Sequence, residues 1–203
     1  MNGGWQCDVS REKYARLDRY EELLRKWNRK INLVAPGTLE SIRQRHIQDS
    51  AQLLRFAPPG SVHWLDLGAG GGFPGLVIAI LAMESGNPRR VTLVESDQRK
   101  AAFLRTVIRE TGVPADVIAE RIEDLQPMNA DVLSARALAP LDKLLGHAER
   151  HLKPGGVAIF PKGARWREEL ARAQSQWHFH HEVAKSEREH LAVILRITGV
   201  AID

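Results

Sequence analysis

The regular alternation of short apolar runs with helical patterns after residue 60 constrains the fold more than any other feature of this chain. The apolar runs are His63 to Leu67, Val91 to Glu95, Ala115 to Ala119, Asp131 to Ser134 and Val157 to Phe160. The segments with helical periodicity are Gly75 to Met83, Gln98 to Thr111, Leu141 to His151 and Arg165 to Gln176. Strands that alternate with helices predict an α/β fold, with a parallel sheet covered by helices on both faces.

The C-terminal segment departs from this alternation. The apolar runs near His178 to Lys185 and Leu191 to Thr198 have no helix between them. They predict a terminal antiparallel hairpin, which would complete a mostly parallel seven-stranded sheet that contains an antiparallel strand. Lys153-Pro154-Gly155-Gly156, just before the fifth run, is interpreted as a turn.

The first sixty residues show only helical signals. A helix is expected to begin after Ser10, which is a suitable N-cap, and a turn is expected at residues 35–37. A second helical stretch is expected from Leu39 to Phe56. We therefore predict an N-terminal helical extension over residues 1–60, followed by the α/β domain over residues 61–203.

Composition places the chain among globular proteins. The 43% hydrophobic and 27% charged residues exclude a disordered chain, and the only cysteine, Cys7, excludes an intrachain disulfide and a cysteine pair for zinc. The longest apolar run, near Leu76 to Met83, is too short to span a bilayer. We expect a cytoplasmic protein without a metal ion and without a membrane partner.

Arginine dominates the positive charge. The net charge is +4, and 29 residues are Lys or Arg. Arginine forks match phosphate and stack on bases, so this composition favours a nucleic-acid partner. Codon bias in a GC-rich genome is an equally good explanation of the arginine content.

The strongest local motif is a strand that runs directly into a glycine loop and then into a helix. Gly68, Gly70, Gly72 and Gly75 lie within the segment 64–75. Such a loop lets the backbone approach a ligand closely, and the following helix N-terminus favours negative charge, so a nucleotide-like ligand is expected. From Gly70 onward the loop also satisfies G-x-G-x-x-G, which leaves a NAD-dependent dehydrogenase as an alternative.

Two carboxylates and one turn favour a ligand other than NAD. Asp66, two residues before Gly68, can meet the ammonium of a methionine moiety but would repel a pyrophosphate. Glu95 ends the second strand, where a carboxylate can hold both hydroxyls of a ribose. Together with residues 152–156, this arrangement resembles class I (Rossmann-like) S-adenosylmethionine-dependent methyltransferases.

Residues that the chain lacks argue against two classes of methyl acceptor. Methylation of a pyrimidine C5 needs a cysteine nucleophile, and Cys7 lies far from the predicted sheet. Amino-group methylation is associated with Asn or Asp followed by Pro-Pro after the fourth strand, where this chain has Ser134-Ala135-Arg136. A ring nitrogen such as guanine N7 has an available lone pair and needs placement rather than a general base.

Five ordered motifs cover nearly the whole chain and resemble the glucose-inhibited division protein B family. The motifs are Trp27-Asn28 with Ile31-Asn32-Leu33, residues 45–50 (RHIQDS), residues 66–75 (DLGAGGGFPG), residues 134–137 (SARA) and Lys162-Gly163. The resemblance implies a bacterial cytoplasmic enzyme that transfers a methyl group from S-adenosylmethionine to N7 of a guanine in 16S rRNA, near the decoding site.

The resemblance also implies site residues. It implies that Gly68 and Phe73 line the methyl donor, that Ile122 and Glu123 flank its adenine, and that Arg136 reaches it from the fourth strand. The residues themselves independently favour Asp66, Gly68, Gly70 and Glu95 as donor contacts. One departure from the family is Gly71, where many members have Pro.

Four further residues are candidates for contact with the substrate: Arg45, His46, Asp49 and Lys162. The first three lie within about one helical turn of each other, and Lys162 follows the fifth strand. Arg188 and His190 are weaker candidates. The expected partner is small-subunit rRNA or the 30S subunit, and the expected state is a monomer. A small-molecule enzyme on the same fold and a non-catalytic RNA-binding module remain alternatives.

Overall fold

The computed structural model describes residues 10–187 and 191–202, so the predictions made for Cys7, Arg188 and His190 lie outside the described residues. The strands are β1 (His63–Leu67), β2 (Arg90–Val94), β3 (Ala115–Ile118), β4 (Ala130–Ala135), β5 (Leu152–Lys162), β6 (Trp177–Lys185) and β7 (Val193–Ile202). The α-helices are α1 (Arg11–Asn28), α2 (Asp49–Ala51), α3 (Gly75–Ala82), α4 (Gln98–Thr111), α5 (Leu141–His151) and α6 (Trp166–Ala173). The other helical turns are η1 (Pro36–Ser41), η2 (Arg43–Gln48), η3 (Gln52–Phe56) and η4 (Ile122–Asp124).

The strands form one seven-stranded sheet in the order β3-β2-β1-β4-β5-β7-β6. β1 runs parallel to β2 and β4, whereas β7 runs antiparallel to both of its neighbours, β5 and β6. The predicted fold class is therefore confirmed, including the antiparallel strand. The strand order reverses between β1 and β4, which is where open α/β sheets form a ligand-binding crevice at the carboxyl ends of their strands.

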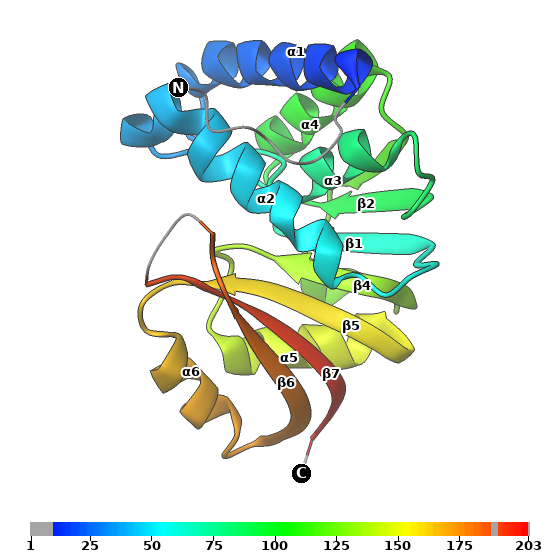
Figure 1. Ribbon diagram of the computed structural model, residues 1–203, viewed down its shortest axis with the longest axis vertical. Helices are drawn as coiled ribbons and strands as arrows, with labels where there is room; N and C mark the ends of the chain where they lie inside the picture. Colours follow the sequence, from blue (N-terminus) through cyan, green and yellow to red (C-terminus); the bar gives the residue numbers. More distant parts are fainter. Residues whose placement is uncertain (1–9, 188–190, 203) are drawn as a thin grey trace.

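Alternate residues of β1 serve two hydrophobic cores, one on each face of the sheet. Trp64 is fully buried in the core that α1, α3 and α4 share, and Leu65 is fully buried in the core that α5 and α6 share. Figure 1 shows α1 and α4 side by side at one end of the molecule, and α5 and α6 at the other. Among the described residues, no helix is long and apolar enough to cross a membrane.

The second predicted helical stretch is helical but irregular, which corrects the expectation of one continuous helix from Leu39 to Phe56. η2 is a π-helix, and 3-10 turns precede it and follow α2. Ile42 and Ile47 are both buried although they are five residues apart, a spacing that the wider turn of a π-helix places on one face. The Ser50 hydroxyl donates to the His46 carbonyl (2.6 Å) within the same segment.

The expected turn at residues 153–156 is wrong, because these residues belong to β5. The pairing of β4 with β5 shifts register between Ala130 and Val132, so the strand begins with a bulge. Gly155 has a φ of +76°, and a Cβ at Gly156 would lie 3.0 Å from the Ala130 carbonyl oxygen. The two glycines therefore accommodate the bulge. The other predicted ends of helices and strands differ from the observed ends by a few residues.

The N-terminal helices pack against the glycine loop. The Tyr20 hydroxyl, which is fully buried, donates to the Gly71 carbonyl. Asn28 Oδ1 accepts from the amides of Leu33 (2.9 Å) and Val34 (3.0 Å), which holds the end of α1 to the chain that follows it. α1 shares one hydrophobic core with α3 and α4. The division of the chain at residue 60 into an extension and a domain remains a prediction.

Among the described residues, His151 is one of three residues with buried side-chain polar atoms that lack a hydrogen-bond partner. His151, at the end of α5, is 0% exposed, and neither ring nitrogen makes a hydrogen bond in the described residues. Burial, reinforced by the nearby charge of Arg150, lowers the pKa of His151 to about 4. The folded protein thus holds this imidazole neutral in a range where the unfolded chain takes up a proton.

We predict that replacing His151 with Leu reduces the loss of stability in acid. Because the unfolded state binds more protons below pH 6.5, the wild-type free energy of unfolding should fall by about 2 kcal/mol between pH 7 and 4.5 from this group. Urea unfolding at several pH values measures the effect. H180Q, at an exposed position of β6, serves as the control. Parallel pH profiles for wild type and H151L would contradict the prediction.

Candidate active site

The loop between β1 and α3 has the backbone conformation that its glycines predict. Gly68, Gly70 and Gly72 have φ values of +65°, +54° and +92°, all in the left-handed region that disfavours residues with a Cβ. At Gly75 a Cβ would lie 2.2 Å from Leu93 Cδ2 and 2.8 Å from Asp66 Oδ2. The loop therefore leaves partly exposed backbone without a side chain at Gly68 and Gly70, and it packs α3 tightly against the sheet.

Asp66 is a buried anchor for this loop. Its side chain is 0% exposed; Oδ2 accepts from the Gly75 amide (3.0 Å) and Oδ1 accepts from the Ser134 hydroxyl (2.7 Å). Burial raises the pKa of Asp66 to about 7, although both hydrogen bonds and the charge of Arg136 act in the opposite direction. The carboxylate thus joins β1, β4 and the start of α3, and direct contact with a ligand ammonium has no support in this geometry.

Glu95 lies at the carboxyl end of β2 and is 8% exposed. Its Oε2 accepts from the Gly70 amide (2.8 Å) and its Oε1 accepts from the Asp97 amide (2.9 Å). Ile122 and Glu123 lie in η4, which follows β3 at the same edge of the sheet, with Ile122 partly buried and Glu123 exposed. The expected donor contacts from β1, β2 and β3 are therefore brought to one edge.

Arg136, directly after β4, joins the glycine loop to the N-terminal helical segment. Its guanidinium donates to His46 Nδ1 (3.0 Å), and its Cζ lies 5.0 Å from the centre of the Phe73 ring. The His46 and Phe73 rings are 5.0 Å apart, and Tyr20 packs on Phe73 at 5.3 Å. Phe73 is 3% exposed, so its side chain supports Arg136 and His46 rather than lining an open surface.

His46 is held neutral and in one tautomer. Burial, together with the charges of Arg136 and Arg45, lowers the pKa of His46 to about 4. Because Arg136 is only a donor, Nδ1 accepts and Nε2–H donates to Thr38 Oγ1 (2.9 Å). Both ring nitrogens are therefore engaged, which leaves no free nitrogen for proton transfer.

A cleft of about 780 Å³ lies beside this cluster. Its walls come from η2, α2, the segment after β4, the end of β5, α6 and the start of β7. The four predicted substrate contacts line it: Arg45, His46, Asp49 and Lys162. Asp49 is partly buried and accepts from Gln52 Nε2 (3.3 Å), whereas Arg45 is exposed. The structure brings these four residues together from two parts of the chain, residues 45–49 and the end of β5.

The segment Arg136–Pro140 separates the cleft from the glycine loop. Arg136 and Leu138 line the cleft, and a Cβ at Gly68 would lie 2.6 Å from Leu138 Cδ1. Ala137 has a φ of +53°, which is strained for a residue with a side chain. A short strained segment thus forms a wall shared by the two halves of the site.

Lys162 lines the cleft but is not an exposed lysine, and its contact with a nucleic acid remains a prediction. It is 9% exposed, and its Nζ donates to the Ala139 carbonyl (3.0 Å) and to Glu169 Oε2 (2.8 Å). The same carboxylate oxygen accepts from the Leu141 amide (3.0 Å) at the start of α5. Lys162 and Glu169 therefore fasten the C-terminal end of the shared wall to β5 and α6.

Sequence reasoning did not identify Leu138, Ser134 or Glu169 as parts of the site. Ser134 and Leu138 flank Arg136 in the chain, so their closeness to a predicted site residue was an available signal. Glu169 had no such signal, because α6 folds back on β5 to bring it to Lys162. Within the described part of the chain, no group of three or more metal-ligating side chains is clustered.

Comparison with known proteins agrees with this geometry. A protein with 13% identity, described as a SAM dependent methyltransferase from Aquifex aeolicus, aligns over 88% of this chain and 98% of its own, with a TM-score of 0.63. M. jannaschii TYW2, solved in complex with AdoMet, has 16% identity over 86% of this chain and 80% of its own, with a TM-score of 0.56. These likenesses show the fold.

Similarity in sequence is much higher with two curated proteins named ribosomal RNA small subunit methyltransferase G. The one from Ruegeria pomeroyi is 55% identical over 193 residues, which cover 95% of this chain and 94% of the relative. The one from Cereibacter sphaeroides is 50% identical over 196 residues, which cover 96% and 93%. The GidB family model, described as rRNA small subunit methyltransferase G, matches residues 13–193. The chain therefore belongs to the rRNA small subunit methyltransferase G family.

Proposed function

We propose that this protein transfers a methyl group from S-adenosylmethionine to N7 of a guanine in small-subunit rRNA. The observation that carries the proposal is the arrangement of two sites against one wall. The glycine loop, in which Gly68 and Gly70 are partly exposed, lies on one side of residues 136–140, and the 780 Å³ cleft lies on the other. A donor at the loop and an acceptor nucleotide in the cleft would have to meet at the edge of this wall, where the acceptor nitrogen can approach the methyl group directly.

The residues present fit the methyl donor. The positive φ values at Gly68 and Gly70 leave backbone that a ligand can approach closely, and Glu95 lies where a carboxylate meets ribose hydroxyls. Ile122 and Glu123 are proposed to flank the adenine, and Arg136 to reach the donor from β4. Bound S-adenosylmethionine supplies an electrophilic methyl sulfonium; the protein residues orient it and exclude water.

The chemistry of the cleft is compatible with a ring-nitrogen acceptor. The His46 ring is neutral, but both of its nitrogens are already hydrogen-bonded, so it does not act as a general base. The described residues that line the cleft include no cysteine nucleophile. N7 of guanine needs neither group, because its lone pair attacks directly once the base is placed in line with the methyl group.

Two residues act as supports in this proposal. Asp66 holds the turn from β1 into α3 through Gly75, and Phe73 supports Arg136 through its ring face. The proposal extends to a cytoplasmic monomer that acts on the rRNA either free or within the 30S subunit. We propose the cytoplasm because ribosomes are located there.

The first test is transfer of radiolabelled methyl from S-adenosylmethionine to small subunits, and to free rRNA, from cells that lack the activity. We expect a single N7-methylguanine, located by mass mapping of nuclease fragments. Binding of the donor without transfer to either substrate would contradict the proposed acceptor. Turnover that rises with a metabolite and is indifferent to RNA would indicate a small-molecule enzyme.

Replacing Arg136 with Ala should weaken donor binding at least tenfold, as measured by titration calorimetry with S-adenosylmethionine. The change removes a charged donor next to the loop and leaves His46 Nδ1 without its hydrogen bond. R105A, at an exposed position of α4, is the control. An R136A variant that binds the donor as tightly as the wild type would remove Arg136 from the donor site.

Replacing Lys162 with Ala should lower donor affinity and kcat together, because it releases the wall that carries Arg136 and Leu138. The loss of a largely buried ion pair should also reduce the free energy of unfolding by about 3 kcal/mol. K162R should restore most of both properties, and K26A on α1 is the control. If K162A raises only the KM for rRNA, the original expectation of an RNA contact is correct instead.

A further inference from the structure

Three arginines line the cleft without making an ion pair to any described carboxylate: Arg45, Arg165 and Arg172. Arg45 comes from η2 on one wall, and the other two come from the N-cap and the last turn of α6 on the opposite wall. Arg165 and Arg172 are seven positions apart, close to two helical turns, so both can face the same side. All three side chains are exposed.

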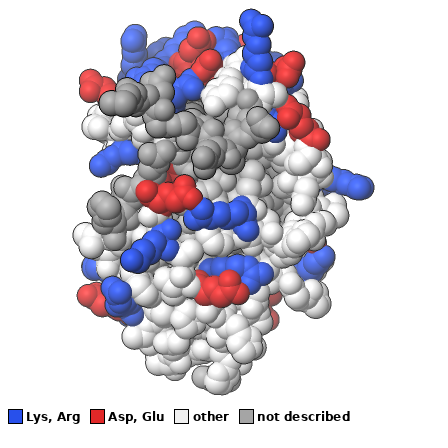
Figure 2. Space-filling view, viewed as in Figure 1, with Lys and Arg blue, Asp and Glu red and all other residues white. Residues whose placement is uncertain are grey.

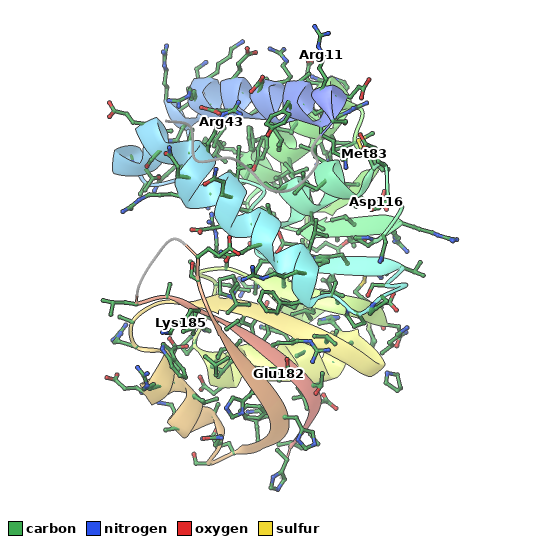
Figure 3. All side chains as sticks on the ribbon, in the orientation of Figure 1. Arg11, Arg43, Met83, Asp116, Glu182 and Lys185 are labelled. Carbon is green, nitrogen blue, oxygen red and sulfur yellow. The ribbon has the colours of Figure 1, made fainter. Side chains whose placement is uncertain are left out.

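Two arginines of the N-terminal helix, Arg19 and Arg25, are in a different state. Arg19 pairs with Glu22 (3.0 Å) and Glu110 (2.9 Å), and Arg25 pairs with Glu21 (2.7 Å). Arg43, which Figure 3 labels beside α1, pairs with Glu21 (2.8 Å) and Asp18. A guanidinium that already has a carboxylate partner must give it up to bind a phosphate, so Arg19, Arg25 and Arg43 are poorly suited to bind an anion.

The cleft as a whole is cationic. Its lining cations are Arg45, Arg136, Lys162, Arg165 and Arg172, and its lining carboxylates are Asp49, Glu168 and Glu169. Glu169 is already paired with Lys162, and the imidazole of His46 is neutral. Figure 2 shows Lys and Arg side chains across the middle of the molecule as well as over α1, whereas the lower end of this face is largely uncharged.

Arginines on opposing walls that pair with no described carboxylate suit the phosphates on either side of an inserted nucleotide. Arginine presents a planar fork of donors that matches phosphate oxygens, and phosphate contacts set the position and orientation of a nucleic acid. The wall that holds Arg136 and Leu138 lines the same cleft. A nucleotide held from both sides would place its base toward that wall.

We propose that Arg45, Arg165 and Arg172 bind the RNA phosphates that flank the acceptor guanine, so that the RNA enters between η2 and α6 rather than across α1. This inference rests on the proposed function. It assigns the contact to residues outside the donor site, so charge removal there should change RNA binding and leave donor binding intact.

The experiment compares two variants of the full chain that lose the same charge. R165A/R172A removes two arginines from the cleft, and R19A/R25A removes two from α1, whose exposed ion pairs contribute little to stability. Binding to an unmethylated small-subunit rRNA transcript is measured over a series of KCl concentrations, together with methyl transfer and calorimetric donor binding. R45A tests the opposite wall in the same way.

For R165A/R172A we expect a KM for rRNA about tenfold higher and a kcat close to that of the wild type. The slope of log K against log salt should decrease by about 1.5, and R45A should decrease it by about 0.8. R19A/R25A should keep the wild-type slope. Donor affinity should not change in any of the three variants.

Two results would overturn the proposal. One is a wild-type salt slope in R165A/R172A or in R45A, and the other is an equal or larger loss of slope in R19A/R25A, which would place the RNA across α1. Neither result concerns the reaction itself. If the wild-type protein transfers no methyl group to rRNA, the proposed function fails, and this outcome is measured separately.

Discussion

The buried carboxylate of Asp66 is the constraint on which the rest of the site depends. It joins the end of β1, the start of α3 and β4 through the Gly75 amide and the Ser134 hydroxyl. Burying a carboxylate is unfavourable unless its oxygens accept hydrogen bonds, and here both do. The anchor lies between β1 and β4, where the strand order reverses. Because the turn is held from within, its outer side can consist of bare glycine backbone.

The segment after β4 converts this fold into a site with two compartments. Arg136 contacts His46 and the Phe73 ring on one side, while Leu138 packs over Gly68. Strain at Ala137 persists only where the surroundings hold it, and the Lys162–Glu169 pair provides that restraint at Ala139 and Leu141. The geometry of the shared wall thus depends on β5 and α6 as well as on its own residues.

Arginine side chains occur in two different environments in this structure. On α1 the guanidinium groups of Arg19 and Arg25 form exposed ion pairs with nearby carboxylates, including Arg19 with Glu110 of α4. In the cleft, Arg45, Arg165 and Arg172 have no such partners among the described residues. Net charge alone does not distinguish these two states, since both contribute equally to the value of +4. The distinction depends on which carboxylates the fold places within reach.

The sequence by itself determined the features that depend on local spacing: the order of strands and helices, the terminal hairpin, and the glycine turn that follows Asp66. These follow from periodicity and from the positive φ that only glycine adopts easily. Tertiary structure alone decided the π-turn that buries Ile42 and Ile47, the bulge at residues 153–156, and the burial of Lys162 against Glu169. Each of these depends on partners distant in the chain, whose positions exist only once the sheet and its covering helices have packed together.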